Sequence, residues 1–421
     1  MRAISVVAAV LLCAVFALPV AAVEVEYWHP QQPPNGDVLD RDMAAEHMRA
    51  YPEVKIRLQE IPTENMADKM TLAVASGRLP DVVRDYLGRV GAWGNMGLLE
   101  DLAGTMPQED IDDFYPDILQ SFVVNGQLIG YPHRMWVQTY DANKTILDRA
   151  GVELPRGEWD MAQWNAMAEK ISAVPGVYPT VLFAGGRGGD YWMLQVFECF
   201  GAHLYESGDY AHTSLNCGEG IAALEWMLEV LANGWAPAGA AGMSGKECTG
   251  YWNEGRIALG CAGTRIALPE YNRENFESGV AKELQDIRVV TQPHAAGAPT
   301  PGLFAGPSGF CVFRQDSDGV RNAAVAFVQD MTGAERSEYW VRTYDCLPVR
   351  RSVNPWVGID AYESTVRLVG EYGLADMGIV SEHYLEARDL FSLLRQEVFA
   401  GLKGPREALD DFEASMAALW E

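Results

Sequence analysis

Aromatic side chains that could stack on a sugar ring are frequent in this chain. Four of its 12 tryptophans directly follow a tyrosine: Tyr27-Trp28, Tyr191-Trp192, Tyr251-Trp252 and Tyr339-Trp340. Sugars present apolar C–H faces that pack on aromatic rings and hydroxyls that need fixed hydrogen-bond partners. The same rings are common in protein cores. The pairs therefore indicate either a carbohydrate site or core packing.

Arginine side chains offer a second kind of binding chemistry, because the guanidinium fork pairs bidentately with carboxylate and phosphate. An anionic ligand, such as a uronate or a polyol phosphate, is therefore an alternative, and the arginines that motivate it are Arg84, Arg89, Arg134, Arg187 and Arg265. The glycine-rich segment 185–189 could also cradle an anion on backbone N–H groups. It lacks both the P-loop ending and the Rossmann spacing, which favours a mobile loop beside a cleft.

Catalytic and metal-binding motifs are incomplete in the sequence. Glycoside hydrolysis needs two carboxylates about 5–10 Å apart, and a chain with 58 acidic residues supplies such pairs by chance. Gly242-Met243-Ser244-Gly245 does not complete a nucleophile elbow. The spacing of Cys199, His203, His212 and Cys217 fits no common zinc module. We expect no cofactor and no metal, and a secreted carbohydrate-active enzyme is a remote alternative.

The N-terminus carries the pattern of a secretory signal peptide. Arg2 precedes an uncharged run from Ala3 to Val23 that contains Ala21-Ala22 near its end. A retained membrane anchor is the alternative, because a run of this length could just span a bilayer. We expect cleavage after Ala22, removal of residues 1–22, and a mature protein in the periplasm.

Charge and cysteine content restrict the partners and the chemistry of the mature chain. The formal net charge of −26 repels nucleic acid and anionic lipid, so we expect no nucleic-acid partner. Six cysteines follow the predicted signal peptide: Cys199, Cys217, Cys248, Cys261, Cys311 and Cys346. An even number in an exported protein permits disulfides. We expect at least one disulfide, although the sequence does not select its partners.

Alternating strand and helix patterns predict a parallel α/β sheet near the N-terminus. Three short segments have strand character: Val23–Trp28, Lys55–Ile61 and Pro80–Val83. Helical patterns separate them, Val38–Tyr51 and a segment from Pro62 to Gly77, which gives the order β-α-β-α-β. The 421 residues exceed what one core usually organises, so we expect two lobes. Pro293–Gly309 is rich in Pro, Gly and Ala and is the expected linker.

Several segments resemble, in order, the extracellular solute-binding proteins of ABC transporters, specifically the carbohydrate-binding family 1 that includes maltose-binding protein. Leu79-Pro80-Asp81-Val82-Val83, followed by Gly97-Leu98-Leu99, is similar to that family's Pro-Asp strand and its Gly-Leu-Leu sequel. Further similar segments are Gly126–Pro132, Asn143-Lys144, Trp159-Asp160, Asn253–Leu259 and Leu347–Arg350. The sequence departs from the family at Asp141-Ala142 and at Thr264-Arg265.

The resemblance implies an α/β protein with the two-lobed periplasmic-binding-protein fold (type II) and a ligand cleft between lobes joined by hinge crossings. The N-terminal lobe would hold residues 23–134 plus about 303–355, and the C-terminal lobe residues 135–302 plus about 356–421. The implied function is the secreted substrate-binding component of an ABC importer. It would capture a mono- or oligosaccharide by lobe closure and deliver it to the permease subunits. We expect a monomer without enzyme activity.

Matching the family segments residue by residue gives candidates for ligand contact. Those at the lip of the third strand, beside the first crossing, at the start of a cleft helix and at the place of a cleft tryptophan are Arg84, Asp85, Arg89, Trp136, Tyr191, Trp192 and Arg265. Gln31 and Gln32, after the first strand, are two more. For Arg84, Asp85 and Arg265 the alternative is a surface ion-pair network.

Overall fold

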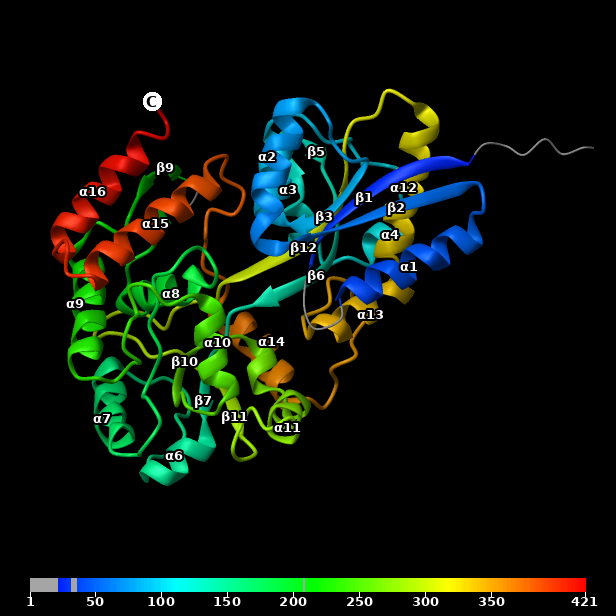
Figure 1. The fold of residues 1–421 in the computed structure, drawn as a ribbon. Coiled ribbons are helices and arrows are strands. Elements are labelled where there is room, and N and C mark those ends of the chain that lie inside the picture. The colour runs from blue at the N-terminus through cyan, green and yellow to red at the C-terminus, as the bar shows by residue number, and fades with distance from the viewer. Residues whose placement is uncertain (1–21, 32–35, 207–208) are drawn as a thin grey trace, which may run out of the picture.

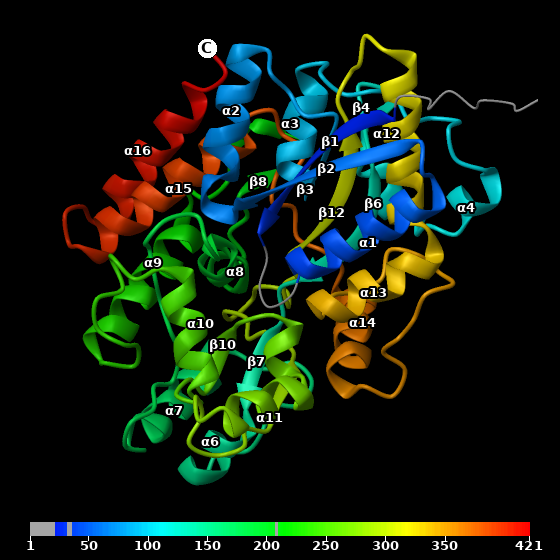
Figure 2. The same cartoon turned by 45° about the vertical axis from the view of Figure 1, so that its right-hand side comes forward.

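The computed structural model of the chain describes residues 22–31, 36–206 and 209–421 (Figure 1). The signal-peptide residues 1–21 and the candidate Gln32 lie outside the described residues. Two groups of elements, each with its own sheet, lie side by side with connecting segments between them (Figures 1 and 2). None of the helices in the described ranges is long and apolar enough to cross a membrane.

The first lobe is built on a five-stranded sheet of order β2-β1-β3-β12-β6. Its strands are β1 (Val23–Gln31), β2 (Val54–Pro62), β3 (Val82–Tyr86), β6 (Tyr131–Val137) and β12 (Ala305–Val312). β1 pairs in parallel with β2 and β3, as the alternating pattern predicted, and β12 runs antiparallel between β3 and β6. Residues on both faces of this sheet are buried, because helices cover each face.

Helices cover both faces of the first sheet. One side carries α1 (Gly36–Ala50), α12 (Asp318–Thr332) and α13 (Ala334–Tyr344), and α3 (Leu87–Asn95) packs on the other, beside α2 (Met66–Ser76) (Figures 1 and 2). α2 ends at Gly77, which adopts a left-handed φ of 65°. Smaller elements complete this lobe: η1 (Thr63–Asn65), α4 (Gln108–Asp112), α5 (Pro116–Gln120), β4 (Val123–Val124) and β5 (Gln127–Leu128).

The second lobe has a three-stranded antiparallel sheet of order β10-β7-β11, formed by β7 (Tyr140–Asn143), β10 (Leu259–Cys261) and β11 (Ile287–Val290). Its helices are α6 (Lys144–Ala150), α7 (Met161–Ser172), α8 (Asp190–Phe200), α9 (Gly218–Ala232), α10 (Gly245–Asn253), η2 (Thr264–Ala267), α11 (Pro269–Glu277), α14 (Asp360–Tyr372), α15 (Tyr384–Phe399) and α16 (Pro405–Ala417). β8 (Tyr205–Glu206) and β9 (Asp209–Thr213) pair antiparallel in a separate two-stranded sheet. The C-terminal helices therefore return to this lobe.

The chain passes between the lobes after β6, before β12 and after α13. The linker predicted at Pro293–Gly309 is wrong in its last part, because residues from Ala305 onward form β12. Gly309 is one reason that this part of β12 has the composition of a linker. A Cβ at this position would lie 2.4 Å from the ring of Phe122, so the strand needs a glycine to pack against that ring.

Candidate ligand-binding cleft

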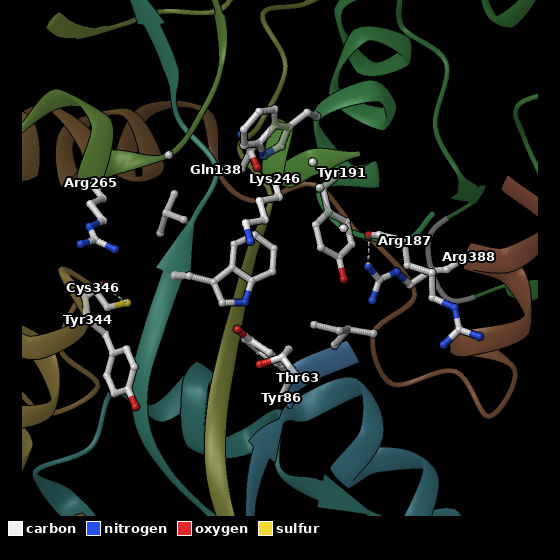
Figure 3. Close-up of a pocket in the computed structure, with 18 of the residues that line it drawn as sticks. Thr63, Tyr86, Gln138, Arg187, Tyr191, Lys246, Arg265, Tyr344, Cys346 and Arg388 are labelled. Carbon is white, nitrogen blue, oxygen red and sulfur yellow. Dashed lines mark hydrogen bonds between the residues drawn. The ribbon is translucent and has the colours of Figure 1, made fainter. Parts of the chain in front are cut away.

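A cleft of about 930 Å³ lies between the two lobes and is lined by both (Figure 3). This volume suits a small ligand, since binding pockets commonly enclose about 300–1,000 Å³. The first lobe contributes side chains from β3, β6 and the segments around α2, α3 and α13, among them Thr63, Tyr86, Arg89, Trp136 and Tyr344. The second lobe contributes side chains and glycines from α8, α10, η2 and α15, among them Gly188, Tyr191, Lys246, Arg265 and Arg388.

An aromatic stack lines the cleft. The half-buried Trp136, on β6, stacks on Tyr191 of α8 with ring centroids 5.1 Å apart and planes inclined by 27°. Gly306, on β12, lies opposite Trp136 of β6. It makes room for the indole, because a Cβ there would lie 2.7 Å from the ring. The Tyr191 hydroxyl is hydrogen-bonded to that of Tyr384 on α15. The stack thus joins the first sheet to two helices of the second lobe.

A glycine-rich loop forms part of the second wall. Gly188 and Gly189, directly before α8, line the cleft together with Gly245 and Lys246 at the start of α10. A Cβ on Gly245 would lie 1.9 Å from the Gly188 carbonyl oxygen, so the two backbones are in direct contact. Ser244 and Glu247 form a capping box that fixes the first turn of α10. These contacts hold Arg187 and Lys246 on adjacent backbone segments.

Arginine side chains around the cleft are held by carboxylates. Arg89 donates from Nε to Asp85 Oδ2 at 2.5 Å, and also from Nη2 to the other carboxylate oxygen. Burial opposes the charge of Arg89, but the Asp85 carboxylate offsets it and raises the arginine pKa above its usual value. Arg388 forms the corresponding pair with Asp190, in which both nitrogen–oxygen distances are 2.8 Å. The guanidinium groups are therefore fixed in place before any ligand arrives.

Two more arginines of the cleft are paired in more open surroundings. Arg187 pairs with Asp389 of α15, and the two side chains are 35% and 56% exposed. Arg265, in η2, lies 3.0 Å from Asp345, which follows α13. Its guanidinium also lies 4.5 Å from the ring centroid of Tyr271. The arrangement can present hydrogen-bond donors to a polar ligand from several sides.

The family model for bacterial extracellular solute-binding proteins matches residues 42–365. The chain belongs to this family. Mannitol-binding protein of Pseudomonas aeruginosa is 21% identical to this solute-binding protein over 259 residues, which are 60% of this chain. The match spans 58% of that curated relative.

Solved structures of similar shape include proteins whose names state a bound carbohydrate. An ABC substrate-binding protein of Listeria monocytogenes in complex with cycloalternan is 20% identical, with a TM-score of 0.76 over 95% of this chain and 99% of that one. Maltose-bound MalE3 of T. maritima is 17% identical, with a TM-score of 0.81 over 94% and 100% of the two chains. These matches confirm the predicted two-lobed α/β fold, with its cleft between the lobes.

The solute-binding protein brings five of the predicted contact residues to its cleft, and they are Arg89, Trp136, Tyr191, Trp192 and Arg265. They come from both lobes. Trp192 also packs edge-on against Phe183, with centroids 5.4 Å apart, so part of its ring belongs to the core.

Arg84 and Asp85 do not line the cleft, and their side chains are 1% and 0% exposed. Arg84 Nη2 lies 2.6 Å from Asp40 Oδ2 and 3.2 Å from the Tyr344 hydroxyl. Asp85 holds Arg89. The ion-pair alternative describes both residues, although their network is buried rather than on the surface. They position Tyr344 and Arg89, which do line the cleft.

Gln31 ends β1 with an exposed side chain and is not among the lining residues. Its carbonyl accepts a hydrogen bond from the hydroxyl of Thr63, which does line the cleft.

Cleft residues that the sequence reasoning missed include Tyr384 and Arg388 on α15. They are four residues apart, a spacing that puts both on one face of a helix. That spacing was the available signal, but nothing in it indicates that α15 lies beside the cleft.

Three of the four Tyr-Trp pairs contribute mainly to cores. Trp28, Trp252 and Trp340 are 7%, 1% and 0% exposed. Trp340 donates from its indole nitrogen to the Met331 carbonyl at 2.8 Å, as a buried tryptophan requires. The pair Tyr191-Trp192 is the one that faces the cleft.

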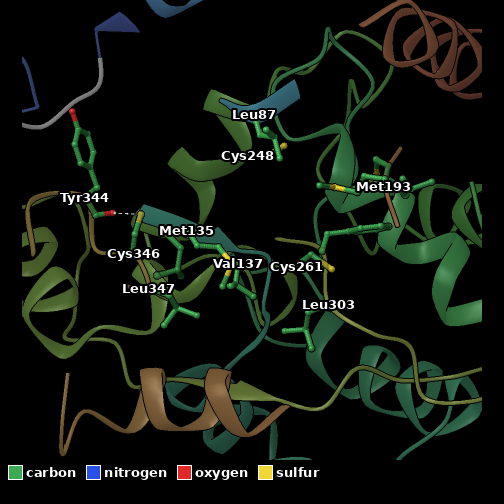
Figure 4. Close-up of a cluster of buried hydrophobic side chains, with 14 of the residues drawn as sticks. Leu87, Met135, Val137, Met193, Cys248, Cys261, Leu303, Tyr344, Cys346 and Leu347 are labelled. Carbon is green, nitrogen blue, oxygen red and sulfur yellow. Dashed lines mark hydrogen bonds between the residues drawn. The ribbon is translucent and has the colours of Figure 1, made fainter. Parts of the chain in front are cut away.

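The predicted disulfide is wrong, because all six cysteines are free. Four of the thiols have separate hydrogen-bond partners on different elements. Cys346 donates to the Tyr344 carbonyl at 3.2 Å (Figure 4), Cys311 donates to the Val83 carbonyl at 3.5 Å, and Cys217 caps α9 by accepting from Gly220. Burial raises the pKa of Cys311 and Cys346, which keeps both thiols protonated.

The histidines of the Cys-x3-His-x8-His-x4-Cys run also have other partners. His203 pairs with Glu198 at 2.8 Å, and His212 pairs with Asp209 at 2.9 Å. Among the described residues, no group of three or more His, Cys, Asp and Glu side chains is arranged to hold a metal.

Proposed function

We propose that this protein is the substrate-binding component of an ABC importer and that its ligand is a carbohydrate. The observation that carries the proposal is the Trp136–Tyr191 stack, which stands between two lobes and is surrounded by hydrogen-bond donors. A stacked aromatic wall offers the apolar surface that C–H faces of a sugar need, and fixed polar groups orient the hydroxyls. The mannitol, cycloalternan and maltose in the names of similar proteins support the same class of ligand.

The proposed contacts are divided between the lobes. Trp136 and Arg89 belong to the first lobe, whereas Tyr191, Trp192 and Arg265 belong to the second. In this proposal the rings stack on the sugar and the guanidinium groups donate to its oxygens. A ligand that contacts both lobes binds the closed arrangement better than the open one, so it shifts the population toward closure.

We also propose lobe boundaries, an oligomeric state, a partner and a location for the protein. The predicted boundary at residue 134 moves to the end of β6 at Val137, so the first lobe is residues 23–137 plus about 303–355 and the second is residues 138–302 plus about 356–421. The protein acts as a monomer in the periplasm and delivers its ligand to permease subunits, which distinguish the closed from the open shape.

A binding screen tests the proposal directly. Thermal-shift measurements on the mature protein would use mannitol, glucose, maltose, maltotriose, uronates and polyol phosphates, followed by calorimetric titration of those that stabilise. A ligand at 100 times its dissociation constant stabilises by about 2.7 kcal/mol. Solution scattering with and without a saturating ligand should show a smaller radius of gyration on binding, with a change in tryptophan fluorescence.

Two results would overturn the proposal. One is a complete screen in which no carbohydrate stabilises the protein. The other is recovery of a chemically altered sugar after many turnovers, which would identify the protein as a carbohydrate-active enzyme. Identical scattering with and without a bound sugar would remove closure but leave reversible binding intact.

A further inference from the structure

Arg89 and Arg388 approach the cleft from opposite lobes with the same geometry. Each guanidinium is held side-on, through Nε and Nη2, by a carboxylate that is almost fully buried. This leaves Nη1 of each arginine as the remaining donor group. Within the described part of the chain, neither Nη1 has a hydrogen-bond acceptor, although both residues line the cleft. The Nη1 group of each arginine is therefore available to donate hydrogen bonds to a ligand.

The two guanidinium groups also repel each other. Arg388 acts on Arg89 as a like charge, in addition to the larger effects of burial and of Asp85. Tyr384 connects their surroundings, because its ring touches Gly88, the residue before Arg89, and lies 5.4 Å from the Arg388 guanidinium. An anion placed between the two arginines would remove this repulsion. It would also contact both lobes at once.

The wall beside Arg388 carries more positive charge. Lys246 is exposed, its amine points into the cleft in Figure 3, and no acidic partner accompanies it among the described residues. Arg187 lies on the backbone segment that contacts the start of α10, and its side chain pairs with Asp389. Both side chains are partly exposed, so this ion pair is weak and can be exchanged for a ligand.

Acidic side chains are scarce on the cleft surface. Only Asp68 and Asp345 are among the described acidic residues that line it, and Asp345 already pairs with Arg265. The whole chain has a net charge of −26, so composition alone would favour an acidic wall. A donor-rich, acceptor-poor surface matches a ligand that is rich in acceptors and negatively charged.

We propose that the ligand is an acidic carbohydrate whose carboxylate or phosphate group binds between Arg89 and Arg388, while its ring packs on Trp136 and Tyr191. This inference rests on the proposed function and narrows its substrate class. Bonds from guanidinium to an anion are roughly twice as strong as those between neutral groups. Because the two arginines belong to different lobes, recognition of the charge and closure of the cleft become one event.

Matched sugar pairs test the charge of the ligand. Glucuronate and galacturonate differ from glucose and galactose by a carboxylate in place of the C6 hydroxymethyl group, and glucose 6-phosphate tests the phosphate form. Calorimetric titration should give at least 10-fold tighter binding for an acid than for its neutral counterpart. The preference should shrink when the salt concentration rises from about 0.05 M to about 0.5 M, because salt screens partly exposed charges.

Charge-removing variants locate the anion. Arg388→Gln should reduce the preference for the acid at least 10-fold, and Lys246→Gln about two- to threefold. Arg367→Gln, on the exposed face of α14 and 58% exposed, loses the same charge outside the cleft and should leave the preference unchanged. If Arg388→Gln does not fold, as judged by circular dichroism, Arg89→Gln and the comparison of sugar pairs on the native protein decide the question.

The binding results distinguish failure of the acidic-ligand inference from failure of the carbohydrate-binding function. Tighter binding of a neutral sugar than of its acid overturns the inference, whereas the carbohydrate function stands. Binding of neither acidic nor neutral carbohydrates overturns both. Binding of acetate or inorganic phosphate as tightly as a uronate or sugar phosphate would show an anion site without carbohydrate recognition, and this would also overturn the inference.

Discussion

Arg265 Nε lies 3.0 Å from Asp345 Oδ2, and this ion pair connects the two lobes. Arg265 belongs to η2, which packs against β11 in the second lobe, whereas Asp345 ends α13, which packs against β6 in the first. Burial raises the pKa of Asp345 to about 6, although Arg265 acts in the opposite direction. The pair is therefore charged at neutral pH and is lost in mild acid.

Asp345→Asn should loosen the contact between the lobes of the ligand-free protein at neutral pH. Asparagine tolerates the left-handed φ of 50° at this position but carries no charge. A partly exposed ion pair contributes at most about 1 kcal/mol, which corresponds to roughly a fivefold shift between lobe arrangements. Solution scattering should give a larger radius of gyration for the variant at pH 7.5. The two proteins should be alike at pH 5, because Asp345 is then protonated in the native protein. A difference that persists at pH 5 contradicts this role.

Trp136→Ala should weaken carbohydrate binding by roughly 30-fold, because truncation of a buried aromatic anchor typically costs about 2 kcal/mol or more of binding free energy. The melting temperature should change little, since Trp136 is only half-buried. Trp252→Ala is the matched control. That ring is 1% exposed, so its loss should cost about 3–5 kcal/mol of stability. Unchanged affinity with a large drop in melting temperature would instead place Trp136 in the core.

Gly88→Ala should disturb the contact between α3 and Tyr384. A Cβ at Gly88 would lie 2.1 Å from Cε1 of Tyr384, so the tyrosine ring must move away from the cleft surface it now forms. We expect at least 10-fold weaker ligand binding by calorimetry. Gly91→Ala, on the same helix, is the control, because its nearest neighbour outside the helix would be 3.8 Å away. Equal effects of the two variants would show that the helix, rather than the Tyr384 contact, is responsible.

Arg84→Met should chiefly lower stability, whereas Arg89→Met should also lower ligand affinity. Arg84 forms a fully buried pair with Asp40, and breaking such a pair typically costs about 3–5 kcal/mol of stability. Arg89 lines the cleft and is 13% exposed, so its loss should reduce ligand affinity in addition to leaving the buried Asp85 carboxylate unpaired. Denaturant unfolding and calorimetric titration of both variants measure the two effects. A lower affinity of Arg84→Met with native stability would return Arg84 to the group of direct contacts.

Asp141→Asn should remove a pH dependence of stability. Asp141 Oδ2 accepts from the Thr139 hydroxyl at 2.9 Å and from the Gly263 N–H at 3.2 Å, and burial raises the pKa of this carboxyl from 3.8 to about 7. The folded state therefore binds more protons than the unfolded state between about pH 4 and 7. The resulting stabilisation is complete below about pH 4 and is lost as pH rises toward 7.

The native protein should lose up to about 4 kcal/mol relative to Asp141→Asn across this range. Melting temperatures of both proteins from pH 4.5 to 8 measure the difference. Parallel pH profiles for the two proteins would show that Asp141 does not take up a proton on folding.

The fold was largely predictable because β1, β2 and β3 have alternating or apolar patterns separated by helices. β12 was not, since its glycines serve contacts with Phe122 and Trp136 that only the folded chain creates. The same limit separates the candidate site residues that line the cleft from those that do not. Arg84 and Arg89 lie five residues apart and both suited the family match. Only Arg84, on β3, contacts Asp40, which belongs to the distant helix α1, and no local pattern indicates such a pairing.

The central position of β12 in the first sheet determines when that sheet can form. β12 lies between β3 and β6, and its last residue, Val312, follows most of the second lobe in the chain. During synthesis, β3 and β6 therefore leave the ribosome long before the strand that joins them. Such pairings between distant segments are slow to form. The first lobe can complete its sheet only after the intervening residues have been made, so a nascent chain shorter than about 312 residues carries an unfinished sheet with two open edges.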